Sequence, residues 1–283
     1  QSIQKLFPAL EWMHASSKIM LSEAYQKRGD ELKAMYLLQE VIENYTFVEG
    51  GRFSAQAEEK LFNLLSGTAE QLLKTGDFEL AEVRYRWARK YEPDDISLMR
   101  GMVEAGFRTG RGDILINQLQ DSIEVTSDDP VLLYGLGLVL SFKGEKNIKL
   151  LQQSNTYLKQ ALGYNYTLIY PYRTLSFNYE LIEQLQGIET EKTFWSKLWG
   201  ITTSPFRWLY SILPFTEKEE KFRYYEQAIE ALITALELND QHQDPEMEAL
   251  LAQNLANNFY HLGEFGYKNA SEYYRKRLSL FIR

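Results

Sequence analysis

The 283-residue sequence has no cysteine, and it contains only seven prolines and 17 glycines. Without cysteine the chain cannot form disulfides, use a thiol nucleophile or bind a metal through thiolates. The absence does not choose a compartment, because cytoplasmic and exported proteins can both lack this residue. An all-β chain with many tight turns would normally need more proline and glycine. The composition therefore favours helices.

The sequence also lacks an excess of basic residues. Its 31 lysines and arginines face 39 aspartates and glutamates, which gives a net charge of −8 and a pI near 5.2. Binding to phosphates requires a basic surface, so this balance argues against a nucleic-acid partner. With 45% hydrophobic and 14% aromatic residues, the chain still has ample apolar surface to bury, which excludes wholesale disorder.

Long apolar runs are missing as well. No stretch of 18 uncharged apolar residues occurs, which argues against a conventional membrane-spanning helix. The sequence opens at Gln1 without a signal-peptide pattern, so we expect a mature form or a fragment of a longer protein. Localisation stays open between the cytoplasm and the periplasm.

One segment in the first third of the chain has the pattern of a helical hairpin. Small and apolar residues recur at helical spacing before Gly76 and again after Asp77, and the second stripe ends before Pro93, which cannot continue a helix. Two such helices joined by a short turn pack antiparallel. We expect Ala69 and Ala81 where the helix axes come closest. The two stripes are Leu65, Thr68, Ala69 and Leu72, then Phe78, Ala81, Tyr85 and Ala88.

The same arrangement recurs along the chain, as expected for a hairpin that cannot bury its outer face alone. Further turns lie at Gly29, Gly110, Gly144 and Gly263, and another copy has its two helices separated by roughly thirty inserted residues. The stripes of these copies are Leu21, Ser22, Tyr25, Ala34, Leu38 and Val41; Met102 and Gly106; Leu136, Gly137, Leu140, Ser154, Leu158 and Ala161; Leu175, Tyr179, Ala228, Leu232 and Ala235; and Leu255, Ala256, Phe259, Ala270 and Tyr274.

These residues resemble the tetratricopeptide (TPR) repeat, a 34-residue helical hairpin with small residues in both helices, Gly-Asp or similar at the turn and a proline at the end. The match is best over Phe62 to Asp95, and the other copies are degraded. The resemblance implies an all-α solenoid of about six antiparallel hairpins wound into a right-handed superhelix. Two extra residues after Gly263 resemble the longer turn of Sel1-like repeats.

The expected organisation is a leading helix over residues 1–14 followed by a TPR-like solenoid over 15–283. An aromatic-rich insertion at about 187–216 interrupts the fifth hairpin. The acidic pairs ending at Asp95 and Asp129 precede helices. We interpret them as N-caps rather than a catalytic pair, since carboxylates accept hydrogen bonds from the free N–H groups there.

The resemblance also implies a binding face, because helix A, the first helix of each TPR hairpin, lines the concave side of the array. In repeats one to three the corresponding residues are charged, and in repeats four to six they are aromatic and apolar. Aromatics at helical spacing can equally belong to the core. The residues are Lys27, Glu70, Lys74, Arg100, Glu104 and Arg108, then Tyr134, Leu138, Phe142, Arg173, Phe177, Tyr260 and His261. The Lys and Asn set with which some members bind chaperone tails is replaced by Ile19 and Glu23.

The insertion from Phe194 to Phe215 holds three of the five tryptophans, Trp195, Trp199 and Trp208. Such an aromatic segment needs cover. Three readings are open: a plug folded into the concavity, a docking site for a partner protein, or a peripheral contact with a membrane interface.

Catalysis is not indicated, because the three histidines are scattered and no Gly-Lys-Ser/Thr loop, metal-ligand cluster or cofactor motif occurs. The leading hypothesis is a non-enzymatic scaffold that binds a protein or peptide in the concave groove. The alternative is a structural assembly subunit that forms homo-oligomers or associates with a membrane through residues 194–215.

Overall fold

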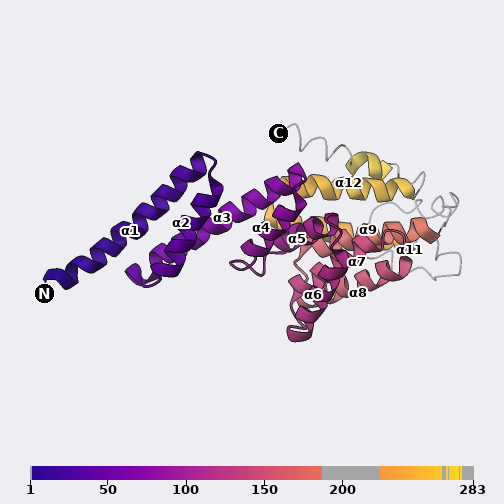
Figure 1. The fold of residues 1–283 in the computed structure, drawn as a ribbon. Coiled ribbons are helices and arrows are strands. Elements are labelled where there is room, and N and C mark those ends of the chain that lie inside the picture. Colours follow the sequence, from indigo (N-terminus) through magenta and orange to yellow (C-terminus); the bar gives the residue numbers. More distant parts are fainter. Residues whose placement is uncertain (1, 187–222, 263–265, 267, 274, 276–283) are drawn as a thin grey trace. The chain divides into compact units, whose positions relative to one another are not determined.

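The computed structural model describes residues 2–186, 223–262, 266, 268–273 and 275, and the side chains of these residues from 10 onward except 241 and 242. Apart from one short 3-10 turn, every regular element of this part of the chain is an α-helix (Figure 1). The prediction of an all-α fold is therefore confirmed. The elements are α1 (Ser2–Lys27), α2 (Glu31–Asn44), η1 (Val48–Gly51), α3 (Arg52–Thr75), α4 (Phe78–Ala88), α5 (Ile96–Arg108), α6 (Gly112–Val125), α7 (Pro130–Lys143), α8 (Ile148–Tyr164), α9 (Ile169–Gln186), α11 (Arg223–His242) and α12 (Pro245–His261).

The chain divides into two compact units, unit 1 from Gln1 to Gly112 and unit 2 from Asp113 to Arg283. In unit 1, α1 packs on α2, α2 on α3, α3 on α4 and α4 on α5. The first helices of successive hairpins also contact one another, α1 with α3 and α3 with α5. Packing that follows the order of the chain is typical of a stacked repeat, in which each hairpin buries the face that its neighbour exposes.

Unit 2 repeats this order of contacts. α7 packs on α8, α8 on α9, α9 on α11 and α11 on α12, and the helices A of two successive hairpins, α7 and α9, touch. After α12, Ala270 and Tyr273 join the same core, where the Tyr273 ring stacks on Phe259 at 5.8 Å. The boundary between the two units falls inside the predicted third hairpin, between α5 and α6.

The turns between helices have the glycine conformation and the aspartate caps that their sequences indicate. Gly76 closes α3 with a left-handed φ of 88°, a conformation that glycine adopts without strain. Asp95 accepts hydrogen bonds from the backbone N–H groups of Ser97 and Leu98 at the start of α5. Asp129 caps α7 in the same way. The interpretation of both aspartates as N-caps is confirmed.

The N-terminal segment is a single helix. α1 runs without interruption from Ser2 to Lys27, so residues 2–14 of the predicted leading helix and helix A of the first repeat are continuous. The Trp12 ring meets Phe53 of α3 edge to face at 6.2 Å, and Ala15 and Ile19 are buried. Within the described residues, none of the helices combines the length and apolar character that a membrane crossing requires.

The hairpin α3/α4 is closed by small residues. Ala69 of α3 and Ala81 and Ala88 of α4 are fully buried. Tyr85 of α4 then packs on the next helix at Gly101 of α5, where an added Cβ would lie 2.3 Å from the phenol ring. Only glycine fits this contact, because such a distance is far inside van der Waals separation.

The hairpin α7/α8 is closed by a glycine and a serine. A Cβ at Gly137 of α7 would meet the Leu158 side chain at 2.8 Å, and the Ser154 hydroxyl of α8 donates to the Gly137 carbonyl at 2.6 Å. Asn178 of α9 donates to Ser154 Oγ and Asn155 Oδ1, each at 2.8 Å, and accepts from the Ser141 hydroxyl. Three helices are thus joined by a buried polar network whose donors and acceptors satisfy one another.

Candidate functional site

Three of the predicted binding residues of unit 1 come together at the surface between α3 and α5. Burial raises the pKa of Tyr85 to about 12, and the nearby charges of Glu70, Arg100 and Glu104 act on the same hydroxyl. The two carboxylates raise the pKa further, whereas the guanidinium lowers it. The phenol of helix B is therefore within electrostatic reach of charges contributed by two successive helices A.

The other predicted residues of unit 1 flank this set. Lys74 pairs with Glu70 at 2.6 Å, one turn away on α3. The Arg108 guanidinium lies 5.9 Å from the centre of the Phe78 ring, within the range of a cation–π contact. Lys27 is exposed in the last turn of α1. The helix A surface of unit 1 thus carries charges of both signs.

In unit 2 the predicted residues of α7 lie deeper than expected for a binding face. Tyr134 is only 1% exposed and packs against Tyr170 at 6.3 Å, and Leu138 is buried as well. Phe142 and Arg173 are half-buried. Tyr134 and Leu138 thus contribute to the core, because α7 is so apolar that almost every residue from Val131 to Ser141 is buried.

Exposed aromatics of unit 2 come from α9 and α12. Phe177 is 46% exposed and Tyr260 is 56% exposed. His261 stacks on Tyr225 of α11 at 5.3 Å and lies 3.9 Å from a carboxylate oxygen of Glu180 on α9. Burial raises the pKa of Glu180, and a charge on His261 would act in the opposite direction. Sequence reasoning did not single out Glu180, although it lies three positions after Phe177.

A second acid of α9 is buried with little compensation. Glu183 is 1% exposed, and neither carboxylate oxygen makes a hydrogen bond of good geometry. Burial raises its pKa from 4.5 to about 7, and the charge of Glu226 adds to the shift, while the Tyr224 backbone opposes it. The group lies one turn beyond Glu180 on α9, where the buried Thr174 and Asn178 side chains are hydrogen-bonded. An acid inside an apolar stripe is the one feature of the sequence that could have indicated it.

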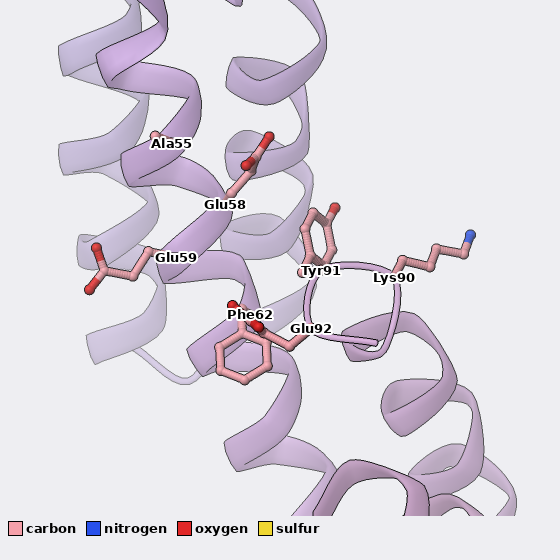
Figure 2. A pocket seen from close by; sticks show the side chains of 7 residues that line it. All are labelled: Ala55, Glu58, Glu59, Phe62, Lys90, Tyr91 and Glu92. Atoms are coloured by element: carbon pink, nitrogen blue, oxygen red, sulfur yellow. The ribbon is translucent and has the colours of Figure 1, made fainter. Parts of the chain in front are cut away.

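A hollow of about 450 Å³ lies beside α3, at a place that the repeat pattern did not indicate (Figure 2). Its walls come from the N-terminal part of α3, which precedes the repeat-like segment, and from the loop that follows α4. The lining residues are Ala55, Glu58, Glu59, Phe62, Lys90, Tyr91 and Glu92.

The aromatic insertion and its three tryptophans, Trp195, Trp199 and Trp208, fall outside the described residues, as do residues 263–265 of the predicted Sel1-like turn. Their proposed roles remain predictions. In the part of the chain that the structure describes, no group of three or more His, Asp or Glu side chains is arranged to hold a metal ion.

Comparison with known proteins is informative for the fold alone. The sequence matches no family model and no curated protein. Among solved structures, the human IFIT1 dimer with m7Gppp-AAAA is similar at 14% identity and a TM-score of 0.50, over 91% of this chain and 58% of that chain. The chain thus spans little more than half of IFIT1.

Two further solved structures have lower TM-scores. TTC0263, a TPR protein of Thermus thermophilus, is 16% identical over 78% of this chain and 96% of its own, with a TM-score of 0.43. PilW, a type IV pilus biogenesis factor, is 12% identical over 95% and 94%, with a TM-score of 0.46. The successive packing of antiparallel helical hairpins defines the class: the described part of the chain has a TPR-like helical-repeat fold, as the sequence predicted.

Proposed function

We propose that this protein is a non-enzymatic scaffold that binds a polypeptide along the surface of its helices A. The observation that supports the proposal is the gathering of Glu70, Arg100 and Glu104 over Tyr85, because it brings charges from two successive repeats onto one surface. Charges of both signs at fixed spacing can orient an extended guest and select its register.

The exposed aromatics of unit 2 supply the second element that a peptide surface needs. Phe177 and Tyr260 offer rigid apolar area to a guest side chain, and rings of this kind are the usual anchors of protein interfaces. The His261 and Glu180 pair adds a polar group beside them. Each unit thus has a distinct lining, charged in unit 1 and aromatic in unit 2.

A peptide selection tests this proposal. A random dodecapeptide phage library would be panned against the purified chain, and the enriched peptides would be synthesised with a fluorophore and titrated by fluorescence anisotropy. We expect Glu104→Lys, Arg108→Glu or Phe177→Ala to weaken binding about tenfold, because each change removes a surface contact. Far-UV circular dichroism should stay unchanged.

The matched control is Glu79→Lys, the same charge reversal at an exposed position of α4 on helix B. This variant should bind the selected peptides as tightly as the wild type. Failure to enrich any sequence, or equal affinity for all four variants, would overturn the proposal.

The alternative role as an oligomerising or membrane-associated subunit is tested by light scattering of the chain with and without residues 194–215. A monomer at all concentrations that stays soluble after the deletion would exclude this alternative. A concentration-independent oligomer that is lost on deletion would establish it.

A further inference from the structure

The hollow beside α3 has an aromatic floor and lies apart from the residues used in the proposed function. Phe62 and Tyr91 are both half-buried and come from α3 and the loop after α4. Its volume of about 450 Å³ lies in the range of small ligand sites. A long side chain could therefore place its methylene groups on the two rings.

Carboxylates surround this floor. Glu58, Glu59 and Glu92 line the hollow against a single ammonium, that of Lys90. Figure 2 shows Glu58 and Tyr91 extending in the same direction, whereas Lys90 and Glu59 point away from them to opposite sides. The pKa of Tyr91 is raised by burial and by the charges of Glu58 and Glu43, so a fourth carboxylate, from α2, also acts on the floor.

Within the described chain, these three acids differ from other acids of unit 1 in lacking an ion-pair partner. Glu23 pairs with Lys60, Glu40 with Lys18 and Glu70 with Lys74. Among the described residues, by contrast, Glu58, Glu59 and Glu92 make no ion pair. Unpaired carboxylates over two aromatic faces create a negative potential that a cation relieves, and a cation above an aromatic ring gains a further attraction.

We propose that this hollow binds an arginine or lysine side chain of a polypeptide partner. The aliphatic stem lies on Phe62 and Tyr91, and the charged head lies against Glu58 and Glu92. An anionic or neutral guest gains nothing from the carboxylates. The proposal goes beyond the surface of helices A, since every residue that it uses lies in α3 before residue 63 or in the loop 90–92.

The test compares two peptides of the same shape. Acetyl-(Gly-Arg)₄-Gly-amide and its citrulline analogue, which is neutral, would each be titrated into the chain while the Tyr91 ring is followed by ¹⁹F NMR of a site-specific fluorotyrosine. We expect the arginine peptide to bind at least tenfold more tightly, with an affinity that falls as salt rises. Equal binding of the two peptides would overturn the proposal.

Variants locate the contact. Glu58→Gln with Glu92→Gln should weaken arginine-peptide binding about tenfold while the melting temperature stays unchanged, because both side chains are exposed. The control Glu79→Gln, on α4 outside the hollow, should have no effect. An unaltered affinity in the double variant would overturn the assignment.

Two further arms separate this proposal from other sources of binding. Arg108→Glu tests the surface of helices A and should leave the arginine peptide unaffected, so the two proposals can fail independently. We expect spermidine, which presents alkyl-ammonium groups without a peptide backbone, to compete more weakly than the peptide. Competition as strong as that of the peptide would overturn a polypeptide partner in favour of a free polyamine.

Discussion

The hairpins α3/α4 and α7/α8 solve one packing problem with different residues. The first hairpin buries the small apolar residues Ala69 of α3 and Ala81 of α4 completely. The second has Gly137 opposite Ser154, whose hydroxyl bonds back to the glycine carbonyl. The first hairpin fits the repeat pattern best, yet the second is joined to a third helix through Asn178.

This difference shows that a degraded repeat is not a loosely held one. A serine in an alanine slot brings a hydroxyl into the core, and a buried hydroxyl without a partner is costly. Here Asn178 supplies the partner and links α7, α8 and α9. The departure from the repeat pattern is thus matched by polar contacts that the pattern does not contain.

Removing the centre of the network should give the largest effect. Asn178→Leu keeps the approximate volume but leaves the Ser141 hydroxyl and Asn155 Oδ1 buried without a partner, so we expect a loss of about 3 to 5 kcal/mol in the free energy of unfolding. Urea denaturation followed by circular dichroism measures it.

The control for this change is Thr68→Val in α3. Its hydroxyl donates only to the Leu65 carbonyl of its own helix, so the expected loss is below about 1 kcal/mol. Equal losses in the two variants would mean that the network adds nothing to the hairpin α7/α8.

Overfilling the apolar slot should give the next largest effect. Ala81→Leu inserts three carbons at a fully buried position of α4, which packs on α3, at an expected cost of about 1 to 3 kcal/mol. The same change at the exposed Ala24 of α1 should alter stability by less than about 0.5 kcal/mol. A neutral Ala81→Leu would contradict the assigned packing of α3 on α4.

Adding one methyl group compares the two hairpins directly. Gly137→Ala should destabilise by about 1 to 2 kcal/mol, because its Cβ would meet Leu158 at 2.8 Å. Gly67→Ala in α3 meets nothing within 4 Å and should stabilise by about 0.5 to 1 kcal/mol through helix propensity. Thermal melts of both variants give the comparison, and a common sign would contradict it.

A smaller effect should appear as a dependence on pH. The raised pKa of Glu183, about 7 against 4.5, means that the folded state holds a proton that the unfolded state has released. Stability should therefore fall as pH rises from 4.5 through 7, by about 1 kcal/mol between pH 6 and 8. Glu183→Gln should abolish this part of the profile in urea titrations.

Unit 1 also contains a buried acid, Glu82, but this acid forms ion pairs. Glu82 of α4 pairs with Arg86 and Arg111, each at 2.6 Å. If Glu183→Gln shows the same dependence of stability on pH as the wild type, the dependence arises from other groups. The contrast between a paired acid in unit 1 and an unpaired acid in unit 2 would then be wrong.

The hairpins themselves could be predicted from the sequence, because the relevant signals are local. Gly76 and Asp77 mark a turn, and alanines at helical spacing mark the faces that pack. Such features depend on residues within one or two turns of each other, so they survive even where the rest of a repeat is degraded.

The candidate site was harder to predict, because it depends on contacts between distant residues. Asn178 reaches Ser141 and Ser154 across three helices. Tyr134 fits the position of a binding residue, yet the apolar character of α7 on all sides buries it. The hollow combines residues of α3 that precede the repeat, Ala55 to Glu59, with residues 90–92 after α4, and the family pattern does not indicate that these two segments line a common hollow.

The contact between Tyr85 and Gly101 couples the residue types that the two positions can accept. The phenol ring occupies the space that any side chain at 101 would claim, at 2.3 Å from its first carbon. A larger residue at 101 can be accepted only when the ring at 85 is displaced or replaced by a smaller side chain, whereas a smaller residue at 85 needs no change at 101. In a library of variants, side chains at 101 should therefore occur together with smaller residues at 85.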